Sequence, residues 1–225
     1  TLNLYSLEKF NKAKNISDYF AGILLLSESK YSESFKYLKT LNGLESSHLT
    51  YSTKYLYTLI NSGNFNQAFA FSKKNEREQR DSFESDLIIG IYYLKISKYE
   101  FAEKYFIKAK RRGSRSILDE YLIDSLYLLS KLKKNNLNES ILILNQFDKR
   151  FDNLNRIQKV FLNCYFENNN TEQLFNELIS EQKTDFSRYN FFYSKYLESI
   201  GKNKKAEMII TSALKKYPRN ILLNQ

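Results

Sequence analysis

The chain has 225 residues, of which 42% are hydrophobic and 16% aromatic, and it contains one proline and six glycines. This composition supplies enough apolar material for a large core and excludes a disordered chain. Because helix breakers are so few, we predict an almost wholly helical fold. The formal net charge of +10 favours an anionic partner, although a general lysine excess of the kind that an AT-rich genome imposes also explains it.

Apolar run lengths and cysteine usage set limits on topology and compartment. The longest apolar run, residues 23–26, is far shorter than the roughly 20 residues of a membrane-spanning helix, so we expect no span. Cys164 is the single cysteine, which excludes an intrachain disulfide. The chain begins at Thr1 without an initiator Met, so we expect that an upstream segment was removed. Cytoplasm is favoured as the location, with periplasm or envelope as the alternative if that segment was a signal peptide.

Three dipeptides, Lys30-Tyr31, Asn64-Phe65 and Lys98-Tyr99, recur with their aromatic residues at positions 31, 65 and 99, which are 34 residues apart. Apolar residues at three- and four-residue steps on both sides of each dipeptide predict two helices around a polar break. A fixed period of this length indicates stacked copies of one unit. Each helical hairpin leaves an apolar face that only its neighbour can cover.

Looser copies of the same pattern follow at Asn136-Leu137, Asn170-Thr171 and Lys202-Asn203. The longer interval before the fourth copy predicts an insertion in the connection near Gly113. After Pro218 an apolar stretch resembles the start of a further helix, so we expect the chain to continue or to self-associate through its C-terminal end. The predicted fold is an all-α, right-handed α-solenoid forming a single superhelical domain over residues 1–225, with an N-terminal helix at 1–14 that covers the first hairpin and six hairpins at approximately 15–48, 49–82, 83–116, 121–154, 155–186 and 187–218.

The repeated unit resembles the tetratricopeptide repeat, a 34-residue helix-turn-helix motif with small residues at its eighth, twentieth and twenty-seventh positions. The third copy matches through Gly90, Ala102 and Ala109. Small residues let helices approach closely, and the aromatic after the turn fills the gap between them. Leu174 stands where a small residue is expected, so the fifth hairpin is predicted to pack irregularly. The positions assigned to the repeat framework are Gly22, Tyr31, Gly63, Phe65, Ala68, Gly90, Tyr99, Ala102, Ala109, Gly201, Ala206, Ala213 and Pro218. Together with the composition, the family indicates a bacterial protein.

Residues for catalysis are scarce. His48 is the only histidine, and the sequence has no glycine-rich stretch of the kind that cradles phosphates. The run Ser46-Ser47-His48 lies in a connection and lacks a third group to orient a base. We therefore expect no catalytic, metal or cofactor site.

The resemblance implies a concave surface lined by the first helix of each hairpin. Its positions are mostly apolar in the first three hairpins and turn basic in the last three, which suits a peptide with hydrophobic anchors and an acidic end. The alternative is that the apolar positions pack against adjacent helices and the cations repeat the lysine excess. The implied function is a non-catalytic scaffold or adaptor for a protein or peptide. The groove residues are Tyr19, Ile23, Tyr57, Ile60, Leu94, Lys95, Leu129, Lys133, Arg156, Lys159, Arg188, Phe191 and Lys195.

A second functional hypothesis uses the densest basic run, from Lys104 to Arg115. Its cations could contact the phosphates of RNA without reading sequence. Nearby Tyr105 is a candidate for base stacking, whereas Phe106 occupies a core position. Cations at this place also complement the C-terminal end of a helix. RNA binding is thus the alternative function, less favoured than protein binding.

Overall fold

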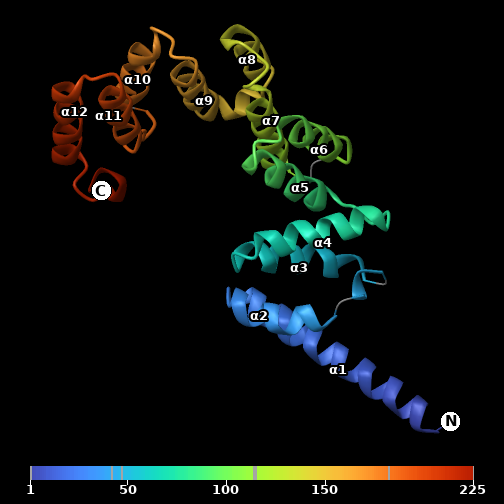
Figure 1. Cartoon of the computed structure of the whole chain (residues 1–225). Helices are drawn as coiled ribbons and strands as arrows, with labels where there is room; N and C mark the ends of the chain where they lie inside the picture. The colour runs from blue at the N-terminus through green and yellow to red at the C-terminus, as the bar shows by residue number, and fades with distance from the viewer. Residues whose placement is uncertain (1, 42, 47, 114–115, 182, 225) are drawn as a thin grey trace. The chain divides into compact units, whose positions relative to one another are not determined.

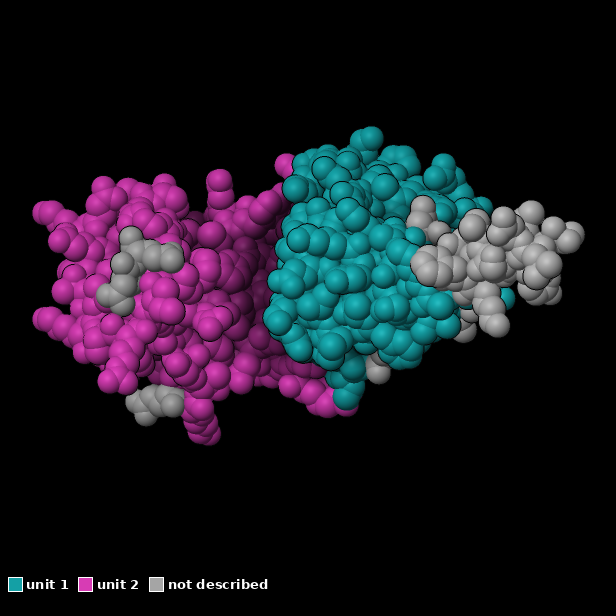
Figure 2. Space-filling view, turned by 90° about the horizontal axis from the view of Figure 1, so that it is seen from below, with its two compact units in different colours: residues 1–130 teal, residues 131–225 magenta. Residues whose placement is uncertain are grey.

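The computed structural model describes the backbone of residues 2–41, 43–46, 48–113, 116–181 and 183–224 (Figure 1). Contacts divide the chain into two compact units (Figure 2), residues 1–130 and 131–225, here called unit 1 and unit 2. Unit 1 contains the helices α1 Leu2–Ser27, α2 Tyr31–Leu38, α3 Leu49–Asn61, α4 Phe65–Arg77, α5 Phe83–Lys95, α6 Tyr99–Arg111 and α7 Ile117–Lys131, which ends at the boundary. Unit 2 contains α8 Leu137–Leu144, α9 Asp152–Tyr165, α10 Thr171–Ser180, α11 Tyr189–Ser199 and α12 Asn203–Lys216.

The predicted all-α fold is confirmed. In the described ranges the twelve α-helices follow one another in the order and at the breaks that the repeat predicts. Five pairs of consecutive helices pack as hairpins, namely α1 with α2, α3 with α4, α5 with α6, α9 with α10 and α11 with α12. That all six hairpins act as one superhelical domain stays a prediction. The segment 1–14 does not form a helix of its own, because α1 runs through it without a break.

Small residues set the distance between the two helices of a hairpin. A Cβ atom added to Gly22 would lie 2.6 Å from Leu38 Cδ2, and one added to Gly90 would lie 2.5 Å from Phe106 Cε1. Both partners are fully buried. Since real Cβ contacts are longer than this, the glycines allow α1 to approach α2, and α5 to approach α6, at a distance that no larger residue permits.

The second hairpin reverses this arrangement. Leu56 stands in α3 at the repeat position of Gly22 and Gly90, and Ser72 stands in α4 at the position of Leu38 and Phe106. Leu56 and Ser72 are both buried. In each of the first three hairpins these two buried positions are therefore occupied by one large and one small residue, whichever helix supplies the large one.

Aromatic rings fill the junctions between successive hairpins of unit 1. Phe69 of α4 stacks on Tyr92 of α5 with ring centroids 3.8 Å apart. Phe35 of α2 stacks on Tyr55 of α3 at 6.3 Å, and Tyr55 meets the edge of Phe71 at 5.0 Å. Such pairs add stability beyond the area that they bury, which explains the high aromatic content of the chain.

Unit 2 has its own core where α9, α10, α11 and α12 meet. Phe175 and Tyr193 are fully buried and stack with centroids 5.1 Å apart. Leu174, which departs from the small residue expected at its position, packs against this cluster while remaining partly exposed. Beyond α12, Pro218 is exposed. A short 3₁₀ helix, Ile221–Asn224, follows and contains the buried Leu223.

Five of the six turns inside hairpins share one backbone conformation. A residue with positive φ follows the first helix in each, and it is Gly63 (φ 76°) in the second hairpin and Ser97 (φ 59°) in the third. The N–H groups of this residue and of the next one donate hydrogen bonds to carbonyl oxygens in the last turn of the helix. In the third hairpin, Ser97 N–H donates to Leu94 O at 3.0 Å. The fourth hairpin instead begins α8 with a capping box between Asn136 and Glu139. The five positive-φ residues are Ser29, Gly63, Ser97, Glu167 and Gly201.

Replacing Ser97 by glycine should stabilise unit 1 by roughly 0.5 to 1 kcal/mol, because glycine adopts a left-handed conformation without the Cβ penalty. Urea unfolding followed by circular dichroism measures the change. Ser32, exposed in the first turn of α2, is the control, since Ser32→Gly should not stabilise the chain. Equal effects of the two substitutions would contradict the assigned turn.

Candidate binding surface

An apolar cavity of about 260 Å³ opens on the first helices of the second and third hairpins. Ile60 of α3 and Ile88 and Ile91 of α5 supply its walls, and Phe65 and Lys95 also line it. Ile91 and Phe65 keep 43% and 52% of their surface exposed. A cavity with apolar walls and one cation suits an apolar side chain that has an acidic group beside it.

The predicted groove residues of unit 1 divide into two groups. Tyr57 and Leu129 are exposed, like Ile91, and are free to meet a partner. Tyr19 and Ile60 instead pack partly against the core of the first two hairpins, and the ring of Tyr19 lies 4.8 Å from that of His48. Adjacent packing therefore accounts for some apolar groove positions. Ile23 and Leu94 are partly buried, and Lys95 is exposed.

The predicted basic residues of unit 2 also divide. Arg156 pairs with Glu181 at 3.2 Å and lies over the ring of Phe186. Lys195 pairs with Glu198 at 2.9 Å and lies over the partly buried ring of Phe191. By contrast, Lys133, Lys159 and Arg188 are exposed. The cations that can meet an acidic partner are thus fewer than the sequence suggests.

Phe65 differs from its expected role. As the aromatic after the turn it is predicted to fill the gap between the helices of its hairpin, but it is half exposed and lines the cavity. Ile88 and Tyr92 were not among the predicted groove residues, yet they contribute to the same cavity. The repeat pattern assigns faces of single helices, whereas a cavity depends on which side chains of two hairpins converge.

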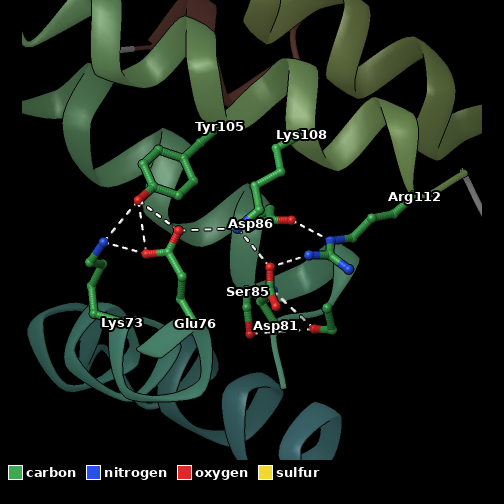
Figure 3. Close-up of polar contacts among 9 residues, drawn as sticks. Lys73, Glu76, Asp81, Ser85, Asp86, Tyr105, Lys108 and Arg112 are labelled. Atoms are coloured by element: carbon green, nitrogen blue, oxygen red, sulfur yellow. Dashed lines mark hydrogen bonds and ion pairs between the residues drawn. The ribbon is translucent and has the colours of Figure 1, made fainter. Parts of the chain in front are cut away.

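Part of the basic run from Lys104 to Arg115 is paired with carboxylates of unit 1, as Figure 3 shows for Lys108 and Arg112. Lys108 lies 2.6 Å from Asp81 and 3.3 Å from Asp86, and Arg112 donates from Nε to Asp86 at 2.5 Å. Lys104 and Arg111 are exposed, and Arg115 lies outside the described residues. Tyr105 and Phe106 are both buried, so neither ring can stack on a base. This corrects the expectation for Tyr105 and weakens the case for RNA.

Hydrogen bonds shift the titration of this network. Glu76 accepts from Lys73, from Lys108 at 3.1 Å and from Tyr105 at 2.9 Å. Burial alone raises the pKa of Glu76, but these donors outweigh it and lower the pKa to about 2. Asp86 is fully buried, and burial raises its pKa above the ordinary value despite Arg112 and Lys108. The network joins α4, α5 and α6 through charges.

The connection around His48 has the character of a loop. His48 Nδ1 lies 3.0 Å from Thr50 Oγ1, and Ser46 Oγ donates to Gly43 O at 2.8 Å. Ser47 lies outside the described residues. In the ranges that the structure describes, no three histidine, cysteine or carboxylate side chains gather closely enough to hold a metal ion. Nor does any described helix combine the length and apolarity required to cross a bilayer.

Comparisons with solved structures place this geometry among known folds. No protein-family model matches the sequence, and no curated protein matches it. The chain is similar to Cut9 in the APC/C hetero-tetramer Cut9–Hcn1, with a TM-score of 0.52 and 11% identity over 93% of this chain and 41% of Cut9. MamA of AMB-1 is similar with a TM-score of 0.46 and 10% identity over 93% and 94% of the two chains. The TPR2AB domain of yeast Sti1, in a complex with pHSP90, has a TM-score of 0.36 and 13% identity over 92% of each chain.

The protein has the tetratricopeptide-repeat fold. Consecutive hairpins, small residues at the close approaches and one recurring turn conformation define that class. The structural similarity to Cut9 covers 93% of this chain. At 11% identity the likeness concerns the fold alone.

Acid should destabilise unit 1 partly through Glu76. Its carboxyl has a lower pKa folded than unfolded, so the stability it contributes is present above about pH 4.5 and is lost as pH falls toward about 2. We expect Glu76→Gln to lower stability at pH 7 and to flatten the loss of stability across this window. Urea unfolding at several pH values measures both effects. The exposed Glu120 serves as control, and identical pH profiles for Glu76→Gln and Glu120→Gln would refute this role.

Proposed function

We propose that the protein is a non-catalytic interaction module that binds a segment of another protein on the first helices of unit 1. The observation that carries this proposal is the apolar cavity between α3 and α5, whose walls combine Ile60, Ile88 and Ile91. Tyr57 adds a further exposed ring on α3. Solvent-exposed apolar surface of this kind marks interaction sites in proteins.

The fold supports the same proposal. Tetratricopeptide-like hairpins generally serve as protein-interaction modules, and the similar structure of Cut9 was solved in an assembly with Hcn1. Packed hairpins hold the cavity walls in place before a partner arrives, so little conformational entropy is lost on docking. A rigid framework with a preformed apolar cavity therefore favours recognition by shape.

The partner segment we propose carries an apolar anchor residue with an acidic residue close to it. The anchor would occupy the cavity walls, and the carboxylate would meet Lys95, which lines the cavity and is exposed. An acidic partner also agrees with the net charge of +10 and with the exposed Lys159 and Arg188 of unit 2. RNA is the weaker proposal, because the basic run pairs with carboxylates and its aromatic rings are buried.

Ile91→Asp should abolish partner binding, since it places a charge in the wall of the cavity. Ile96 provides a matched control, because it has the same exposure, 43%, follows the last residue of α5 and does not line the cavity. Crosslinking in native cells followed by mass spectrometry identifies the neighbours that each variant captures. We expect the unaltered chain and Ile96→Asp to capture the same neighbouring proteins. The Ile91→Asp variant should not capture them.

Both variants should unfold at nearly the same temperature by circular dichroism, so a folding defect is distinguishable from lost binding. Neighbours captured equally by all three proteins would show that binding does not use this cavity.

A further inference from the structure

A second cavity of unit 1, of about 460 Å³, lies between α6 and α7. Ile107 of α6 and Tyr127 of α7 supply its accessible apolar surface, and Lys110 and Arg111 add two cations. The buried Phe106 and Ile123 complete the lining. It shares no lining residue with the cavity between α3 and α5. Its volume lies within the range of sites that hold small molecules, roughly 300–1,000 Å³.

The junction between α6 and α7 is packed differently from an earlier one. The junction between α4 and α5 is filled by the stack of Phe69 on Tyr92, whereas α6 and α7 share a buried contact around Ala109 and Ile123. The cavity lies beside that contact, since Ile123 belongs to both.

The charged residues of the lining indicate the charge of a matching ligand. Lys110 Nζ lies 2.5 Å from Asp124, which offsets its charge. Arg111 is exposed at the end of α6 and presents a guanidinium that can hold a carboxylate with two hydrogen bonds. The lining and its nearest carboxylate together carry one positive charge. A ligand with a single negative charge and an apolar body complements both the walls and this charge.

We propose that the cavity between α6 and α7 binds a small organic monoanion, with its apolar body against Ile107 and Tyr127 and its carboxylate on Arg111. The site is separate from the proposed surface for a protein partner and does not depend on it.

Isothermal titration of the full chain with 2-naphthoate tests the proposal, and 2-naphthalenemethanol supplies a neutral ligand of the same shape. We expect 2-naphthoate to bind, and the alcohol to bind roughly tenfold or more weakly, as expected for the loss of a charge-assisted hydrogen bond. Arg111→Ala should weaken the binding of 2-naphthoate by a similar factor and leave the affinity for the alcohol unchanged. Ile107→Phe should lower the affinity for both ligands, because the larger side chain fills the cavity.

Arg77 is the matched control. It is the exposed last residue of α4, lies 34 positions before Arg111 in the sequence, and does not line this cavity. Arg77→Ala should bind 2-naphthoate like the unaltered chain. The proposal is overturned if 2-naphthoate does not bind at millimolar concentration, if the alcohol binds equally well, or if Arg77→Ala and Arg111→Ala lose the same affinity.

Discussion

The close approach of the two helices of a hairpin, as at Gly22 and Gly90, is the constraint from which the rest of the structure follows. Where glycine lies on the first helix, a leucine or phenylalanine on the second fills the space, at Gly22 with Leu38 and at Gly90 with Phe106. This complementarity fixes the hairpin as a unit with two outward faces. One face then packs on the next hairpin through aromatic rings, and the first helices remain available to form surfaces such as the cavity between α3 and α5.

Much of this fold could be predicted from the sequence because its signals are local. The recurring aromatic dipeptides locate the hairpin turns, and apolar periodicity locates the helices on either side. Residues that depart from the pattern are tolerated where the backbone or packing compensates. Ser97 and Glu167 adopt positive φ in place of glycine, and Leu56 and Ser72 are both buried with the large and small residues exchanged between the two positions.

The surface was less predictable, because it depends on contacts between residues distant in the sequence. A run of cations in the third repeat reads as a nucleic-acid patch, yet Lys108 and Arg112 meet carboxylates contributed by the preceding connection and by α5. Cavity linings likewise combine side chains of neighbouring hairpins, so Phe65 is assigned to the core by pattern and found at a cavity.

Exchanging the large and small residues of the third hairpin tests the central claim most directly. Gly90→Leu and Phe106→Ser are each expected to destabilise the chain severely, one through a clash and the other through a cavity. The double variant reproduces the arrangement of the second hairpin and should be more stable than the two separate losses predict, by about 1 to 3 kcal/mol, when measured by urea unfolding. A double variant that loses the full sum of both effects would contradict the account.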